Sequence, residues 1–209
     1  MRKTINNFDF VAPFYDVLAR IIFGKNIKTA QTHFLNHIPN DAHILILGGG
    51  SGVILKEIFA QKNSRQILYI EKSKKMIALS KKQLTKLQLE QVVFAQDMGE
   101  NINQVFDVII TNFFLDVFEK TGLENMMKLL RGLLSEDGIW LFTDFKNQNI
   151  WWQKMLLKLM FTFFRLFANL ESKQLYDFEE LFDACGMTSL KSKSFFHEMI
   201  ISHVYSAKL

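Results

Sequence analysis

The chain has 209 residues, of which 49% are hydrophobic and 22% charged, so it is long enough to bury one sizeable core and does not need a second domain. Its only cysteine, Cys185, rules out an internal disulfide and fits a reducing compartment. The net charge of +4 is modest, and no stretch of membrane-spanning length is free of charge. The N-terminus lacks the apolar core of a secretory signal, so we expect a single cytoplasmic domain.

The lysines are concentrated between Lys72 and Lys86. Such a run is typical of the solvated face of a helix, and it also has the composition of a patch that binds phosphates. We interpret it as a solvated face, and with so small a net charge we expect no nucleic-acid partner.

From residue 41 onward, apolar β-type runs alternate with helical patterns, which predicts repeated βα units and a parallel sheet. The predicted strands occupy residues 44–47, 67–70, 92–95, 105–111 and 139–143, and the predicted helices occupy residues 53–61, 74–89 and 123–134. The helix over 74–89 is expected to bury Met76, Ile77, Leu84 and Leu87. A turn is expected over residues 135–138, where Asp137 precedes Gly138.

A long helical region follows, and residues 178–184 then predict a short helix that ends at Gly186. Two further β-type runs, 189–196 and 199–207, predict a terminal hairpin with a tight connection at His197 and Glu198. The fold class expected is α/β, with a Rossmann-like, doubly wound, seven-stranded and mostly parallel sheet that closes with an antiparallel C-terminal hairpin.

The most informative motif is the glycine run that follows the first predicted strand. Gly48, Gly50 and Gly52 form G-x-G-x-G, in which the missing Cβ atoms permit positive φ and let the backbone approach a ligand. The N-terminus of the following helix offers the positive end of its dipole. This arrangement predicts a site for a nucleotide-type ligand.

Polar side chains recur at the ends of the next predicted strands. Glu71 lies roughly twenty residues beyond the glycine run, where a doubly wound fold places an acid against ribose hydroxyls. Asp97 and Met98 follow the third strand, and Asn112 follows the fourth. The carboxyl ends of parallel strands form the ligand-binding edge of such sheets, although each of these residues could also serve only as a helix cap or turn former.

Seven segments extend this pattern: FDFVAPFYD at 8–16, GGGSG at 48–52, EKSKKM at 71–76, QDM at 96–98, FDVII at 106–110, LLSEDG at 133–138 and LFDACGM at 181–187. With them the sequence resembles the class I S-adenosylmethionine-dependent methyltransferases, within them the ubiquinone/menaquinone C-methyltransferase-like small-molecule branch. The resemblance implies an N-terminal helical lid over residues 1–40, a cofactor-binding core over 41–145, a helical insert over 146–175, and a terminal helix and hairpin over 176–209.

The resemblance also implies S-adenosylmethionine as cofactor and S-adenosylhomocysteine as product. The cofactor-binding residues that it implies are Gly48, Gly50 and Gly52 at the methionine end, Glu71 at the ribose, Asp97 and the Met98 backbone at the adenine, Asn112, and Tyr15 in the lid near the sulfonium. The sequence departs from the family at Ile46, where the family usually has an acid. It also lacks the Arg-Asn pair of the quinone-methylating members, so quinone precursors cannot be assigned as substrate.

Methyl transfer from a sulfonium is an in-line displacement, so positioning of the acceptor and exclusion of water can supply much of the catalysis. A base is needed only for acceptors that must lose a proton. The candidate bases are His33, His37, Asp116, Asp144, His197 and His203. We choose Asp144, at the end of the fifth predicted strand, as the catalytic base, with Asn112 as the polar residue that orients the acceptor.

Residues 151–170 form an apolar stretch whose length would span a membrane, but Lys154, Lys158 and Arg165 interrupt it. At about 100° per residue these cations share one narrow arc of a helix. The stretch could be ordinary core, the roof of an apolar acceptor pocket, a peripheral contact with a membrane, or a homodimer interface. The resemblance favours the roof, because the corresponding insert helps to shape the family's acceptor site.

The function expected is methyl transfer to a small, apolar or lipid-like acceptor. Because of Ile46, a non-catalytic protein that binds S-adenosylmethionine or serves in protein interactions is the alternative. An RNA or protein methyltransferase is a third hypothesis, which the lysines between Lys72 and Lys86 permit.

Overall fold

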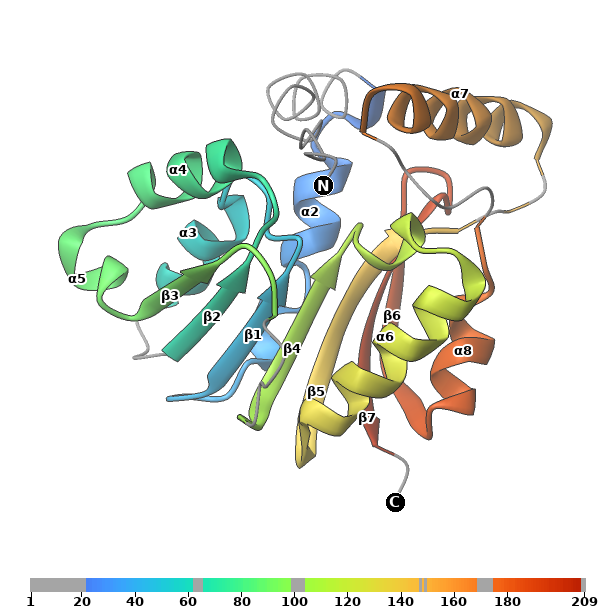
Figure 1. Ribbon diagram of the computed structural model, residues 1–209. Coiled ribbons are helices and arrows are strands. Elements are labelled where there is room, and N and C mark those ends of the chain that lie inside the picture. Colours follow the sequence, from blue (N-terminus) through green and yellow to red (C-terminus); the bar gives the residue numbers. More distant parts are fainter. Residues whose placement is uncertain are drawn as a thin grey trace, which may run out of the picture.

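A seven-stranded sheet forms the centre of the computed structural model, which describes residues 22–61, 66–98, 104–146, 148, 150–168 and 175–207 (Figure 1). The strands are β1 (His43–Leu47), β2 (Gln66–Ile70), β3 (Val92–Ala95), β4 (Phe106–Asn112), β5 (Leu134–Phe145), β6 (Met187–Phe195) and β7 (Ile200–Ala207). Their order is β3-β2-β1-β4-β5-β7-β6. Strands β1 to β5 pair in parallel, while β7 pairs antiparallel with β5 and β6, which confirms the predicted fold class.

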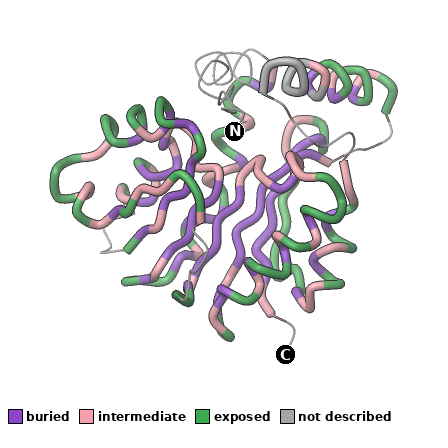
Figure 2. The backbone as a smooth tube through the Cα atoms, in the orientation of Figure 1, coloured by how far each residue is buried: buried purple, intermediate pink, exposed green. Residues whose placement is uncertain are grey.

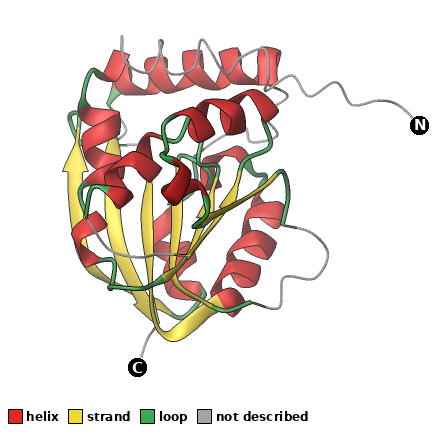
Figure 3. Ribbon diagram, turned by 90° about the vertical axis from the view of Figure 1, so that its left-hand side faces the viewer, coloured by secondary structure: helices red, strands yellow, loops and turns green. Residues whose placement is uncertain are grey.

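Helices cover both faces of this sheet (Figures 1 and 3). The helical elements are α2 (Asn26–Thr32), η1 (Leu35–His37), α3 (Val53–Phe59), α4 (Lys74–Lys82), α5 (Lys86–Leu89), η2 (Leu115–Val117), α6 (Lys120–Leu133), α7 (Trp151–Ala168) and α8 (Phe178–Ala184). None of the helices in the described part of the chain has the length and apolarity needed to cross a membrane.

Strand β1 shows why the sequences of the parallel strands are continuous apolar runs. Leu45 and Leu47 pack into the cluster formed with α6 and α8, whereas Ile44 and Ile46 pack into the cluster on the opposite face with α3. All four side chains are buried because helices cover both faces (Figure 2). The sheet therefore forms the middle layer of the molecule.

The prediction of a single helix over residues 74–89 is wrong, because the structure has two helices there, α4 and α5. Thr85 begins the second helix with a capping box: its hydroxyl accepts from the backbone N–H of Gln88, and the Gln88 side chain accepts from the backbone N–H of Thr85. Of the expected core positions, Met76 is buried, but Leu87 is 73% exposed. The cap therefore overrides the helical periodicity of this segment.

The turn predicted over residues 135–138 is also wrong, because β5 begins at Leu134 and continues through Asp137 and Gly138. Pairing with β4 jumps from Phe106 opposite Leu134 to Val108 opposite Ile139. The extra residues of β5 therefore form an irregular bulge, and the strand resumes its register beyond them.

The connection of the terminal hairpin is longer than the predicted pair of residues. Strand β6 ends at Phe195 and β7 begins at Ile200. Phe196, His197 and Glu198 have φ values of 45°, 52° and 64°, and the N–H of Met199 donates to the Phe196 carbonyl at 3.1 Å. A short left-handed turn, which needs more residues than a tight hairpin, therefore reverses the chain. The helix α8 and the position of Gly186 after it agree with prediction.

Part of the predicted lid lies outside the described residues, including Tyr15 and the segment 8–16. Within residues 22–40, the structure describes α2 and η1, as a helical N-terminal segment requires. The hydroxyls of Thr143 and Ser202 donate to the carbonyl of Ala30 in α2, at 3.5 and 3.0 Å. This segment therefore packs onto β5 and β7.

Candidate cofactor and acceptor site

The glycine run forms a tight loop between β1 and α3. Gly48, Gly50 and Gly52 have φ values of 62°, 63° and 87°, a backbone conformation that residues with a Cβ rarely adopt. A Cβ on Gly52 would lie 2.7 Å from the Cα of Ser80, and one on Gly49 would lie 2.2 Å from the Tyr69 ring. The loop thus needs glycine for its backbone conformation and for close packing against β2 and α4.

Glu71, which directly follows β2, binds this loop. Its Oε2 accepts from the backbone N–H of Gly50 at 2.9 Å, and its Oε1 accepts from the backbone N–H of Ser73 at 2.8 Å. The carbonyl of Gly50 accepts from the hydroxyls of Tyr69 at 2.8 Å and Ser80 at 2.9 Å. These bonds hold the tip of the loop against the carboxyl end of β2.

Gly50 differs from the glycines around it in having open space beside its Cα. A Cβ built there would meet no atom within 4 Å, whereas Cβ atoms on Gly48 and Gly52 would meet Phe114 and Ser80. The loop is therefore packed on its inner side and accessible at its tip. A backbone held in this way, beside a buried carboxylate, fits the donor and acceptor needs of a ribose-containing ligand.

Asp97 and Met98 follow β3 on the same edge of the sheet as Glu71. The side-chain amide of Gln96 donates to the carbonyl of Lys72 at 3.0 Å, which joins the ends of β2 and β3. Asp97 is exposed, while Met98 is half-buried and packs against the main core cluster. The structure therefore brings Glu71, Asp97 and Met98 to neighbouring strand ends, as the sequence predicted.

Asn112, the last residue of β4, lies opposite Thr143 of β5 and is half-buried. The next residue, Phe113, has a φ of 52°, and its backbone N–H donates to the Thr143 carbonyl at 2.8 Å. The Phe114 ring packs against the glycine loop, where a Cβ built on Gly48 would lie 2.8 Å from Phe114 Cδ2. Sequence reasoning did not single out these phenylalanines as site residues, although they directly follow Asn112.

Asp144 is fully buried near the end of β5 and bonds to the backbone. Its Oδ1 accepts from the N–H of Phe145 at 2.8 Å, and its Oδ2 accepts from the N–H of Asp116 at 3.3 Å. Burial raises the pKa of Asp144 well above its ordinary value, and the nearby Asp116 carboxyl raises that pKa further. Asp144 therefore holds η2 against the end of β5.

The Asp116 side chain lies close enough to Asp144 for the two carboxyls to interact. Burial raises the pKa of Asp116 to about 7. Its Oδ1 is buried and has no hydrogen-bond partner among the described residues. Two adjoining carboxyls that disfavour joint ionisation form a group that can hold one proton near neutral pH. Both residues are candidate bases from the sequence, but they are 28 positions apart, so the sequence alone did not indicate their proximity.

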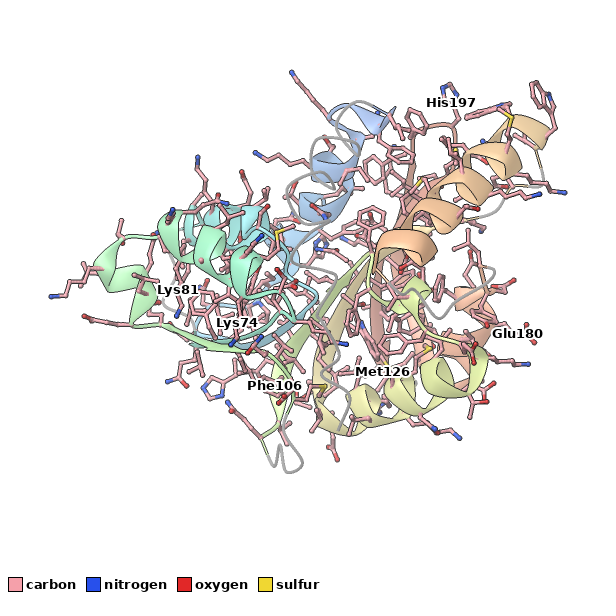
Figure 4. The ribbon with its side chains drawn as sticks, turned by 45° about the horizontal axis from the view of Figure 1, so that its top comes forward. Lys74, Lys81, Phe106, Met126, Glu180 and His197 are labelled. Carbon is pink, nitrogen blue, oxygen red and sulfur yellow. The ribbon has the colours of Figure 1, made fainter. Side chains whose placement is uncertain are left out.

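The four candidate histidines contact other parts of the structure. His33 and His197 are exposed, and the His37 ring nitrogen Nε2 lies 2.9 Å from Lys191 Nζ. His203 is buried within the sheet, where its Nδ1 lies 2.8 Å from Ser189 Oγ, and burial lowers its pKa to about 4. Figure 4 shows His197 beside α7, far from Lys74 and Lys81 on α4.

Ile46, where the resembling family usually has an acid, is 1% exposed and pairs in register with Tyr69 and Ile110. Its side chain packs into the core cluster that covers the α3 face of the sheet. The position therefore contributes an apolar core contact in this chain.

The sheet order, the glycine loop and the strand-end carboxylates together define a Rossmann-like methyltransferase fold. Residues 21–171 match the family described as the methyltransferase small domain, so the chain belongs to this family. Membership in it indicates S-adenosylmethionine as the cofactor. No curated protein matches the chain at a significant level.

Solved methyltransferase structures share this fold. The 1,6-didemethyltoxoflavin-N1-methyltransferase of Burkholderia thailandensis, with bound 1,6-didemethyltoxoflavin and S-adenosylhomocysteine, superposes with a TM-score of 0.69 at 15% identity, covering 97% of this chain and 87% of that one. The methyltransferase in complex with the Trm112 activator of Haloferax volcanii superposes with a TM-score of 0.73 at 11% identity, covering 99% and 100%.

The mitomycin 7-O-methyltransferase MmcR superposes with a TM-score of 0.69 at 12% identity, covering 96% of this chain and 59% of that one. This chain thus spans about three fifths of the length of that enzyme. At such identities the likeness concerns the fold.

Proposed function

We propose that this protein transfers a methyl group from S-adenosylmethionine to a small, apolar or lipid-like acceptor in the cytoplasm. The observation on which the proposal chiefly rests is the contact between Gly50 and Glu71, which holds an accessible backbone loop beside a buried carboxylate. The resemblance of several segments to the ubiquinone/menaquinone C-methyltransferase-like branch supports a small acceptor.

In this proposal the cofactor lies along the carboxyl edge of β1 to β4. Glu71 accepts from the ribose hydroxyls, because an ionised carboxylate can accept several hydrogen bonds at once. The methionine end lies against Gly48, Gly50 and Gly52. Asp97 accepts from the adenine amino group beside the Met98 backbone, while Asn112 and Tyr15 border the sulfonium end.

The bound cofactor would supply a methyl group on its sulfonium, which would pass to the acceptor as the C–S bond breaks and S-adenosylhomocysteine leaves in line. The chain's own contribution is to hold the acceptor and exclude water. Phe113 and Phe114, directly after Asn112, offer apolar surface for this purpose, and Asn112 offers a polar group that can orient the acceptor. The apolar cluster beneath α7, which contains Phe145, Leu157 and Met160, supports an apolar acceptor and α7 as its roof.

For an acceptor that must lose a proton, we propose the Asp144 and Asp116 pair as the base. Asp144 lies near the end of β5, and its bonds to the Phe145 and Asp116 backbones support a positioning role within the pair. Asp116, whose pKa is raised to about 7 by burial, can take up a proton near neutral pH.

Calorimetry with S-adenosylhomocysteine tests the cofactor site. We expect the native protein to bind it, Glu71→Gln to bind at least tenfold more weakly, and Glu90→Gln, which changes an exposed acid on another loop, to bind as the native protein does. Absence of binding by the native protein would overturn the proposal. Transfer of a labelled methyl group to acceptors of graded polarity then tests the acceptor class, and transfer only to polar acceptors would contradict it.

A non-catalytic S-adenosylmethionine-binding protein is the second candidate, and the observation that favours it is Ile46, which packs as core in place of an acid. Cofactor binding without turnover on any acceptor in a cell extract would support it. An RNA or protein methyltransferase is the third, favoured by the exposed lysines of α4. Steeply salt-dependent binding of oligonucleotides would favour an RNA substrate.

A further inference from the structure

Helix α7 is firmly seated by one of its faces. Leu157 and Met160 are buried in a cluster with Phe145 at the end of β5 and with Ile200 at the start of β7. The side-chain amide of Gln153 donates to the His197 carbonyl at 2.9 Å, which ties the helix to the hairpin turn. Helix α7 therefore lies beyond the carboxyl end of β5, next to the turn between β6 and β7 (Figure 1).

The opposite side of α7 exposes large apolar side chains. Trp151, Met155 and Leu159 are 75%, 63% and 65% exposed. They recur every four residues, so they form one stripe along the helix. Three large apolar side chains in a row on an exposed helix mark a surface that contacts something other than water.

A row of cations runs alongside this stripe. Lys154 and Lys158 are exposed and also lie four residues apart. At about 100° per residue they are on the flank of the stripe formed by Trp151, Met155 and Leu159. We call these five residues the outer face of α7. Helix α7 contains no acidic residue between Trp151 and Ala168, so nothing on the helix itself neutralises the lysines.

We propose that the outer face of α7 binds the surface of an anionic lipid membrane, with the helix parallel to the membrane plane. An apolar stripe with Trp at one end and lysines along its flank is the pattern of helices that lie in the interface. The apolar side chains would enter the acyl boundary, while the lysines contact anionic headgroups. The inference does not depend on the proposed methyl transfer.

A second copy of this chain fits the outer face less well. Two outer faces packed against each other would bring Lys154 and Lys158 of each copy together, and α7 contains no acid to pair with them. The lysines of α4 lie far from α7, so they are not part of the same surface (Figure 4). Charge complementarity therefore favours an anionic bilayer.

Flotation with lipid vesicles tests this inference. We expect binding to vesicles that contain phosphatidylglycerol in phosphatidylcholine, weaker binding to pure phosphatidylcholine, and release at high salt. Replacing both Lys154 and Lys158 with Gln is expected to weaken binding by about fivefold for each lysine. Replacing Trp151, Met155 and Leu159 together with Gln is expected to weaken it by more than about tenfold.

Matched controls change equally exposed apolar residues elsewhere: Leu87→Gln and Leu190→Gln, whose side chains are 73% and 57% exposed, are expected to bind vesicles as the native protein does. Native binding by the variant with three Gln residues on α7 would overturn the inference, as would no preference for anionic vesicles. A dimer in sedimentation that this variant abolishes would assign the face to a second copy instead. S-adenosylhomocysteine binding is measured separately, so a failure of the proposed methyl transfer is distinguished from a failure of membrane binding.

Discussion

The backbone N–H of Gly50 donates to Oε2 of Glu71 at 2.9 Å, so the tip of the loop after β1 is tied to the end of β2. The two residues are 21 positions apart, and Glu71 is buried at this contact. The same carboxylate also accepts from Ser73, the residue that caps α4. One side chain therefore organises the loop, the strand end and the following helix, and this is the centre of the candidate cofactor site.

Glu71→Gln should impair both stability and cofactor binding. The amide has a single acceptor oxygen, so it cannot accept from both Gly50 and Ser73 as the carboxylate does. Hydrogen bonds to charged groups contribute about 1.5–3 kcal/mol each, and we expect a loss of about that size in the free energy of unfolding. Urea unfolding measures it, with Glu90→Gln as the control. Unchanged stability would contradict the anchoring role of this carboxylate.

Gly52→Ala and Gly50→Ala should have different effects. A methyl on Gly52 would meet the Cα of Ser80 at 2.7 Å, and positive φ adds strain, so we expect a loss of about 2–4 kcal/mol in unfolding free energy. For Gly50→Ala we expect only the cost of positive φ, about 1–2 kcal/mol in unfolding free energy, because the methyl meets no other atom. The methyl would, however, occupy the accessible tip of the glycine loop.

Gly50→Ala is therefore expected to lower S-adenosylhomocysteine affinity by about tenfold, a loss of roughly 1.4 kcal/mol, while the protein stays folded. Gly132→Ala, in open space on α6, is the matched control and should be neutral or slightly stabilising. Equal stability losses for Gly50→Ala and Gly52→Ala would show that packing against Ser80 does not distinguish them. Calorimetry and thermal unfolding supply the two readouts.

Asp116→Asn should change how stability depends on pH. Burial raises the folded-state pKa of Asp116 to about 7, while the ordinary value is 3.8, so its contribution to stability is fully present below about pH 4 and is lost as the pH rises to about 7. Because the amide resembles the protonated carboxyl, the variant should gain stability over the native protein progressively across this window.

The slope attributable to one proton is at most about 1.4 kcal/mol per pH unit. Urea unfolding between about pH 4 and pH 8 measures it, with the exposed Asp137→Asn as the control. A variant whose stability follows the native pH curve would refute the raised pKa. If the pair also acts as the base, Asp116→Asn should lose the rise in transfer rate around neutral pH.

His203→Phe should change the stability at acidic pH, whereas Asp116→Asn changes it as the pH rises to neutral. Burial lowers the folded-state pKa of His203 to about 4 from 6.5, so the unfolded chain takes up a proton first and stability is lost as the pH falls from about 6.5 to about 4. Phenylalanine keeps the ring contact with Tyr205, whose centroid lies 4.8 Å away. We expect the variant to lose less stability than the native protein on acidification.

The stability of the native protein depends on pH through both Asp116 and His203, whose contributions have opposite signs. Each single variant removes one of these contributions, so its stability should show the contribution of the other residue. Thermal unfolding of the native protein, both single variants and the double variant provides the comparison. Parallel curves for His203→Phe and the native protein would contradict the lowered pKa.

The sequence predicted much of the sheet and several of the strand-end residues correctly. Strands such as residues 44–47 are recognisable because two-sided burial in a parallel sheet requires continuous apolar runs. The spacing from Gly50 to Glu71 follows from one βαβ unit, so local patterns located both partners of the loop contact. The helix over 74–89 was mispredicted because Thr85 caps a new helix with Gln88, and this local cap outweighed the apolar periodicity.

By itself, then, the sequence determined the α/β class, the glycine loop and the identity of the carboxylates at the strand ends, because each depends on residues close together in the chain. Only the tertiary structure decided that the carboxyls of Asp116 and Asp144 lie close together and that α7 buries Leu157 while exposing Met155. Those outcomes depend on which surfaces meet when β4, β5 and β7 assemble. Hydrophobic patterns show that a face must be covered, whereas folding decides which face is covered and by what.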